Sequence, residues 1–106
     1  MKVAIIGSRS LQPVISIKNI PELIISGGAK GVDSIAKQYA LDNNIPYLEF
    51  LPDYSKYPVK SAPIIRNKQI VDNCDILIAY WDGKSTGTKM TIDYARKKNK
   101  IVYIRQ

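Results

Sequence analysis

Short, nearly continuous apolar runs recur along this chain, separated by helical patterns, and this alternation constrains its fold more than any other feature. The runs are Val3–Ile6, Leu23–Ile25, Tyr47–Leu51, Ile76–Trp81 and Ile101–Ile104. The first and fourth barely alternate between apolar and polar residues, which is typical of strands buried on both faces of a parallel sheet. We therefore expect about five strands in such a sheet.

Helical patterns separate several of these runs. An apolar stripe with helical spacing follows the second run and consists of Val32, Ile35, Ala36, Tyr39 and Ala40. A second helix is expected over Ala62–Asn73, where Pro63 fits the first turn, and a third from Thr86 to about Lys98.

Strand and helix thus alternate, which predicts an α/β fold: a single Rossmann-like, three-layer domain over residues 1–106 with a mostly parallel sheet. Right-handed crossovers then place helices on both faces of the sheet. In Leu11–Pro21, two prolines leave room only for a short helix or a turn. Glu49 inside the third run indicates an edge strand, and the long connection Pro52–Ser61 is a candidate lid.

The composition narrows the possible partners and compartments. Sixteen Lys and Arg against nine Asp and Glu give a formal net charge of +7, which favours anionic partners, either nucleic acid or small phosphates. One cysteine and no histidine argue against a disulfide framework and the usual zinc sites, so no metal or cofactor is expected. The apolar run after Lys2 is too short for a signal peptide or a membrane span. We expect a cytoplasmic protein with no membrane partner.

Polar, Gly-rich turns follow the first, second and fourth runs, and parallel strands bring such turns to one edge, where ligands bind. They read Gly7-Ser8-Arg9-Ser10, Ser26-Gly27-Gly28-Ala29-Lys30-Gly31 and Asp82-Gly83-Lys84-Ser85-Thr86-Gly87-Thr88. Glycine permits close approach of the backbone, and a helix beginning at such a turn directs free amides at an anion. Tight turns also need glycine without any ligand, but three at one edge favour a phosphate site.

Two common nucleotide-binding motifs are absent. Gly83-Lys84-Ser85 matches the end of a Walker A loop, but the earlier glycine of that loop would fall on Ile78. The turn Gly27–Gly31 lacks the G-x-G-x-x-G spacing of a dinucleotide fingerprint, which disfavours ordinary NAD-dependent oxidoreductase chemistry.

The chain resembles the SLOG superfamily, which groups the DNA-processing protein A fold with the cytokinin-activating phosphoribohydrolases, and specifically its YspA/cpYpsA-related branch. The resemblance rests on GSRS at 7–10, SGGAKGVD at 26–33, PIIRN at 63–67, CDILIAYWDGKSTGT at 74–88 and the following TIDYA. It implies a Rossmann-like domain that recognises nucleotides or nucleotide-derived molecules, such as ADP-ribose-like ligands, at the carboxyl edge of its sheet. Dimers would be consistent with this superfamily.

The resemblance also bears on catalysis. In the phosphoribohydrolases a Gly-Gly-x-Gly-Thr turn precedes a catalytic glutamate; here Gly87-Thr88 is kept, but the glutamate position falls on Thr91. Asp93 is no obvious substitute, because two residues along a helix rotate a side chain by about 200°. No catalytic residue is assigned, and whether the chain is an enzyme stays open.

Charged residues near the turns are candidate ligand contacts. Arg66 matches the family arginine and could clamp phosphate through two parallel hydrogen bonds, and Arg9 could help; both could equally be solvated surface residues. Asp33 and Asp82 are candidates for ribose hydroxyls, but a carboxylate also suits a first helical turn or a tight turn. The candidate ligand-binding residues are Gly7, Ser8, Arg9, Gly27, Gly28, Lys30, Gly31, Asp33, Arg66, Asp82, Gly83, Ser85, Gly87 and Thr88.

Other residues favour structural roles. Tyr54 and Tyr57 could stack on a base but are more simply exposed loop residues, and Cys74 is expected to be a buried, unreactive thiol. The leading hypothesis is a domain that binds or senses a small phosphorylated nucleotide-like ligand. A nucleoside-monophosphate phosphoribohydrolase is the alternative. A single-stranded DNA-binding module is favoured by the net charge and by the relation to DNA-processing protein A but ranks last, because the sequence shows no aromatic-basic platform. The cations Arg96, Lys97, Lys98 and Lys100 suit a solvated helix end.

Overall fold

All five expected strands form, and they join one parallel sheet in a computed structural model that describes residues 1–106. The strands are β1 (Lys2–Gly7), β2 (Leu23–Gly27), β3 (Tyr47–Phe50), β4 (Ile76–Tyr80) and β5 (Ile101–Arg105). Their order is β3-β2-β1-β4-β5, and every neighbouring pair is parallel. The predicted α/β fold with a parallel sheet is confirmed.

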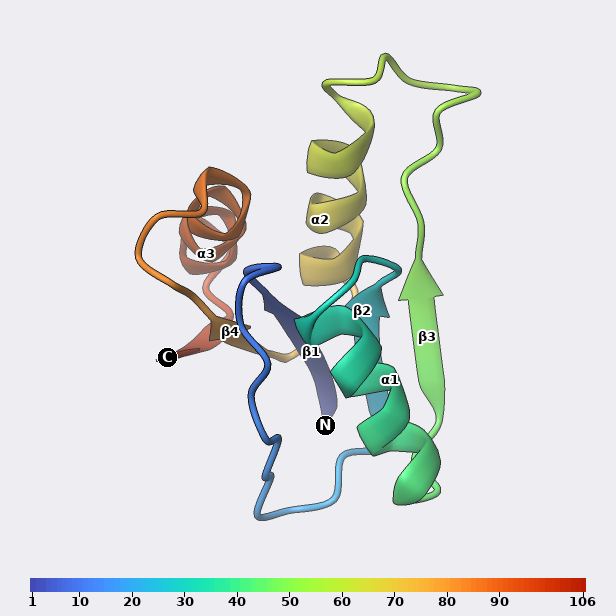
Figure 1. The fold of residues 1–106 in the computed structure, drawn as a ribbon, viewed down its shortest axis with the longest axis vertical. Coiled ribbons are helices and arrows are strands. Elements are labelled where there is room, and N and C mark those ends of the chain that lie inside the picture. Colours follow the sequence, from blue (N-terminus) through green and yellow to red (C-terminus); the bar gives the residue numbers. More distant parts are fainter.

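Helices cover both faces of this sheet, as predicted, and Figure 1 shows their arrangement. The helices are α1 (Val32–Asp42), α2 (Ala62–Asp72) and α3 (Thr86–Lys97). Alternate strand residues point to opposite faces, so Ile5 packs with the apolar stripe of α1, whereas Ala4 packs with Ile70 of α2 and Ile92 of α3. The central strands β1, β2 and β4 are buried on both faces, which explains their continuous apolar sequence.

The segment Leu11–Pro21 forms no helix and runs as an irregular chain between β1 and β2 (Figure 1). Its two prolines lack backbone N–H donors, which prevents a regular helical ladder. Ile15 is nevertheless buried, and Leu11 and Ile17 pack against the α1 side of the core. A loop thus takes part of the space that a crossover helix would fill in a regular α/β fold.

The strand order reverses between β1 and β4, because the chain first adds β2 and β3 on one side and later β4 and β5 on the other. Ligands bind at such a point in open parallel sheets. The predicted edge position of β3, based on Glu49, is confirmed. None of the helices is long and apolar enough to cross a membrane.

Candidate functional site

A polar cavity of about 450 Å³ lies at the carboxyl edge of the sheet, at the reversal point between β1 and β4. The turns after β1 and β4, the first turns of α2 and α3, and two residues near the start of α1 contribute to it. Its lining consists of Ile6, Gly7, Ser8, Arg9, Ser10, Ala29, Asp33, Pro63, Arg66, Asn67, Asp82, Ser85, Gly87, Thr88 and Thr91.

The turn after β1 is fixed against β4 by close packing and hydrogen bonds. A Cβ atom on Gly7 would lie 2.5 Å from Cγ2 of Val32 and 2.7 Å from the carbonyl oxygen of Tyr80, so only glycine fits without a shift. The backbone N–H of Ser8 donates to that carbonyl at 2.9 Å, and Oγ of Ser8 accepts from the backbone N–H of Asp82 at 3.2 Å. The two turns form one rigid wall of the cavity.

Asp82 organises the turn after β4. Its Oδ1 accepts from the backbone N–H groups of Lys84 and Ser85, both at 2.8 Å, and its Oδ2 accepts from Oγ of Ser10 at 2.9 Å. The backbone hydrogen bonds from Ser85 and Lys84 and the side-chain bond from Ser10 lower the pKa of Asp82 to about 2. Both carboxylate oxygens are therefore engaged within the chain, which favours the turn role over ribose binding.

The N-terminus of α3 lies at the cavity. Ser85 is the N-cap, and its Oγ accepts from the backbone N–H of Thr88 at 3.3 Å. The first amides of a helix have no intrahelical acceptor, so those of Thr86 and Gly87 are available to an anion together with the positive end of the helix dipole. A Cβ on Gly87 would meet nothing within 4 Å, so the backbone is open to a ligand there. Thr91, one turn later, donates from Oγ1 to the carbonyl of Gly87 at 2.9 Å.

On the opposite wall, a buried carboxylate and an arginine come together beside Gly27. A Cβ on Gly27 would lie 2.7 Å from Nη1 of Arg66 and 2.9 Å from Oδ2 of Asp33, so glycine leaves the space these two side chains share. Arg66 also donates from Nε to Oδ1 of Asn67 at 2.8 Å and from Nη1 to the carbonyl of Phe50 at 3.5 Å. Arg66 is thus held in place and is not a freely solvated surface residue.

Asp33 is only 7% exposed. Its Oδ1 accepts from Oγ of Ser26 at 3.0 Å, and its Oδ2 accepts from the backbone N–H of Ala29 at 3.2 Å. Burial raises the pKa of Asp33 above its usual value, although these two hydrogen bonds and the charge of Arg66 act in the opposite direction. It is the buried carboxyl group of the cavity.

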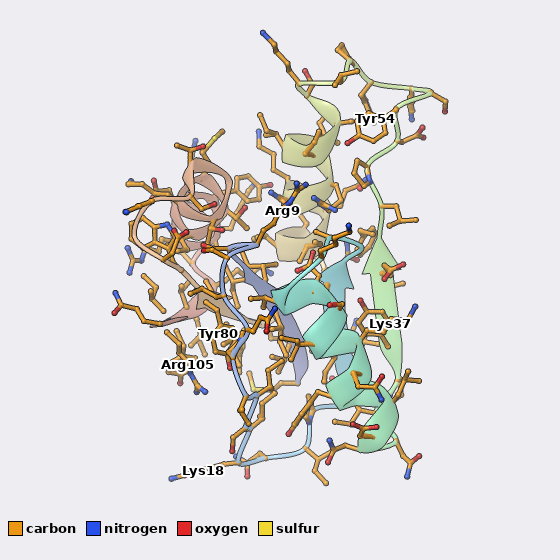
Figure 2. All side chains as sticks on the ribbon, viewed as in Figure 1. Arg9, Lys18, Lys37, Tyr54, Tyr80 and Arg105 are labelled. Carbon is orange, nitrogen blue, oxygen red and sulfur yellow. The ribbon has the colours of Figure 1, made fainter.

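Most of the predicted ligand-binding residues come together in the cavity lining. These are Gly7, Ser8, Arg9, Asp33, Arg66, Asp82, Ser85, Gly87 and Thr88. Figure 2 shows Arg9 just beyond the carboxyl end of β1. The lining does not include Gly27, Gly28, Lys30, Gly31 or Gly83. Gly31 and Gly83 both have φ of 81°, which favours glycine in these turns for backbone reasons alone.

Several lining residues were not among the sequence candidates: Ile6, Ser10, Ala29, Pro63, Asn67 and Thr91. Helical spacing could have found some of them. Pro63 and Asn67 flank Arg66 on the same face of α2, and Thr91 lies one turn after Gly87 and Thr88 on α3. Ser10 belongs to the same turn as the candidates Gly7, Ser8 and Arg9.

The remaining candidates lie elsewhere. Asp93 is exposed and pairs with Lys89 at 2.8 Å, outside the cavity lining, which confirms that it faces away from the site. Cys74 is buried, as expected, and burial raises the pKa of its thiol to about 11. Tyr54 is 57% exposed on the connection between β3 and α2, far from Arg9 in Figure 2, and neither it nor Tyr57 lines the cavity. No group of three or more metal-ligating side chains is present.

Comparisons with known proteins agree with this architecture. The model of the YspA, cpYpsA-related SLOG family matches residues 16–57, less than half of the chain but including the SGGAKGVD turn. The crystal structure of DNA processing protein A (DprA) from Streptococcus pneumoniae is similar, with a TM-score of 0.75 and 22% sequence identity over 97% of this chain. This chain covers 49% of that one, about half its length. No curated protein matches. The predicted SLOG resemblance and Rossmann-like fold are confirmed.

Proposed function

We propose that residues 1–106 form one cytoplasmic nucleotide-binding domain, which binds or senses a phosphorylated, ADP-ribose-like ligand in the cavity between β1 and β4. The observation that carries this proposal is the convergence of the α3 N-terminus and two arginines, Arg9 and Arg66, on one polar cavity. Its volume of about 450 Å³ falls within the range of small-molecule sites. The SLOG resemblance supports a nucleotide-related role.

The phosphate is best placed at the N-terminus of α3. Gly87 lines the cavity there with open space where a Cβ would lie, and the helix dipole favours negative charge. Arg66, held by Asn67, presents a planar guanidinium that suits two parallel hydrogen bonds to phosphate oxygens. Arg9 is exposed at the mouth of the cavity and adds positive charge.

The sugar of the ligand is best placed near Asp33. This carboxyl group is buried at the cavity wall, and each of its oxygens accepts one hydrogen bond within the chain, whereas Oδ1 of Asp82 already accepts two and its Oδ2 one. A hydroxyl donor would satisfy the remaining acceptor capacity of Asp33 without adding another charge to the site. Nucleotides carry such hydroxyls on ribose next to the phosphate, which fits the distribution of groups in the cavity.

A phosphoribohydrolase is the second candidate, and one observation favours it. Asp33 is a buried carboxyl group with a raised pKa, close to Arg66, and such groups are enriched among general acids and bases. Against it, the family glutamate position holds Thr91, whose hydroxyl is bonded to the backbone of its own helix. Enzyme-proportional release of free base from nucleoside monophosphates, abolished by Asp33→Asn, would establish the hydrolase instead of the binding domain.

Nucleic acid is the third candidate, because the similar structure is titled a DNA processing protein and the net charge is +7. The proposal nevertheless favours a small ligand, because the polar groups that could bind phosphate line one cavity of about 450 Å³. The salt dependence of the affinity separates a small ligand from nucleic acid. Each phosphate contact with single-stranded nucleic acid adds about 0.7 to the slope with which the logarithm of affinity falls against the logarithm of salt concentration.

Thermal unfolding in the presence of a panel of ligands tests the proposal. The panel holds nucleosides, their mono- and diphosphates, ADP-ribose, inorganic phosphate and a single-stranded oligonucleotide. A ligand at one hundred times its dissociation constant stabilises the fold by about 2.7 kcal/mol, which raises the melting temperature measurably. We expect a shift with at least one phosphorylated nucleoside that is absent with the parent nucleoside. No shift with any nucleotide, or a shift with the oligonucleotide alone, contradicts the proposal.

A further inference from the structure

The two edges of the sheet are built differently. Edge strand β3 contains Glu49 and lies between Pro46 and Pro52, and such residues hinder the addition of another strand. Edge strand β5 reads IVYIR, with no proline and no charge before Arg105. Natural sheets usually protect an exposed edge with such residues. The unprotected edge therefore indicates that β5 pairs with a further strand.

Apolar side chains of β5 are open on both faces of the sheet. Ile101 is 47% exposed, Tyr103 50% and Ile104 39%. The register places Tyr103 beside Ile78, on the α1 face, whereas Ile104 lies on the face of α2 and α3. Because α1 packs over β1, β2 and β3, the α1 face beside β5 is left as a hollow of about 690 Å³, bordered by Ile17, Ile20, Ile76, Ile78, Tyr103 and Arg105 among others.

The backbone of β5 has unpaired groups along its outer side. The N–H of Ile101 donates to the carbonyl of Asp75, and the carbonyl of Arg105 accepts from the N–H of Trp81. Alternate residues of a parallel strand turn both groups toward the same neighbour, so residues 101, 103 and 105 face β4. Val102 and Ile104 consequently direct their N–H and C=O groups away from the sheet. Figure 1 shows the C-terminus, directly after β5, at this outer edge.

We propose that β5 pairs antiparallel with β5 of a second copy of this chain, around a twofold axis at Tyr103, so that the two sheets become one. In this register Val102 and Ile104 of one copy exchange backbone hydrogen bonds with Ile104 and Val102 of the other. Tyr103 then faces its own counterpart in a non-hydrogen-bonded pair, where side chains are closest and aromatic pairs stabilise the ladder. The pairing is independent of the ligand proposed above.

A second copy fits this edge because the register is self-complementary, as a twofold interface requires. Arg105 lies opposite Ile101 of the other copy, and Lys100 lies opposite Gln106. No cation directly faces another cation across the pair, although the chain carries a net charge of +7. The edge thus satisfies both the apolar and the charge requirements of self-association.

Sedimentation equilibrium of the full chain tests the pairing. The unaltered chain should form dimers, and Tyr103→Lys, which places two ammonium groups opposite each other, should weaken association by at least about tenfold. The matched control is Tyr54→Lys, an exposed tyrosine on the connection between β3 and α2, which should dimerise like the unaltered chain. A monomer at the highest soluble concentration overturns the proposal and leaves the edge for a different protein. A dimer that Tyr103→Lys leaves intact also overturns it.

Cysteine cross-linking tests the register and does not depend on the charge variant. Directly opposite residues have Cβ atoms about 4.5–5.5 Å apart, so oxidised Tyr103→Cys should give a covalent dimer on a non-reducing gel. Ile101→Cys should form no covalent dimer and should run as a monomer on the same gel, because the two copies of residue 101 would lie more than about 10 Å apart along the strands. The native Cys74 is buried and should not compete. Equal cross-linking of both variants, or none by Tyr103→Cys, contradicts the proposed register.

Discussion

Ser10 donates a hydrogen bond of 2.9 Å to Oδ2 of Asp82, and this bond joins the turns after β1 and β4 across 72 residues of sequence. The other oxygen of Asp82 holds the turn after β4 through two backbone N–H groups. Both turns that form this wall of the cavity therefore depend on one ionised carboxylate.

Asp82→Asn should lower the melting temperature, and the loss should depend on pH. The pKa of Asp82 is lowered from 3.8 to about 2 in the folded chain, so its stabilisation is present above about pH 4 and is lost as pH falls toward 2. Thermal unfolding at several pH values should therefore show a difference between variant and unaltered chain that shrinks on acidification. Asp93→Asn, in an exposed ion pair, is the control and should show little effect. A difference that is constant from pH 7 to pH 2 contradicts the assigned role.

Gly87→Ala should separate stability from binding. Gly87 lies in the first turn of α3 with open space around its missing Cβ, so alanine should stabilise the helix by roughly 0.5–1 kcal/mol. If ligand phosphate approaches this backbone, the same methyl group should weaken ligand binding. Chemical denaturation and calorimetric titration of one variant measure both effects. Increased stability with unchanged affinity would show that phosphate does not approach the chain at Gly87.

Cys74 should not react in the folded chain. Its side chain is 2% exposed, its Sγ donates to the carbonyl of Val71, and burial raises its pKa to about 11. The thiolate fraction at pH 8 is therefore small, and the sulfur is shielded from reagents. A chromogenic disulfide reagent should modify Cys74 only after addition of denaturant. Rapid modification of the native chain at pH 8 would show that this region opens readily.

The sequence predicts the sheet well because its central strands β1, β2 and β4 are buried on both faces, so their continuous apolar runs leave a clear pattern. It also predicts that the turns after β1 and β4 share an edge, since this follows from parallel strands. Leu11–Pro21 is different: Ile15 is buried there by tertiary packing with no regular secondary structure, which no periodicity reveals. The hydrogen bond from Ser10 to Asp82 spans 72 residues of sequence, so the sequence could not distinguish the structural role of Asp82 from ribose binding.

The position of Arg66 beside Gly27 shows what the sequence predicts about the site and what it does not. Its helix and its family motif can be predicted from the sequence, but its hydrogen bond to the carbonyl of Phe50 requires the packing of α2 on β3. Gly27 was predicted as a ligand contact, whereas the structure shows it leaving space for Arg66 and Asp33. A glycine in a turn therefore indicates that other atoms approach the backbone closely, but it does not distinguish a ligand from a side chain of the same chain.

Calorimetric titration of Arg66 variants tests the central claim most directly, with the nucleotide that gives the largest thermal shift as titrant. Losing one charge-assisted interaction of about 1.5–3 kcal/mol should weaken binding by Arg66→Ala roughly 10- to 100-fold. Arg66→Lys should recover only part of the loss, because an ammonium group cannot replace the planar fork. Arg96→Ala, at the far end of α3 and outside the cavity lining, is the matched control and should bind like the unaltered chain. Equal affinity of Arg66→Ala and the unaltered chain would contradict a phosphate site at this cavity.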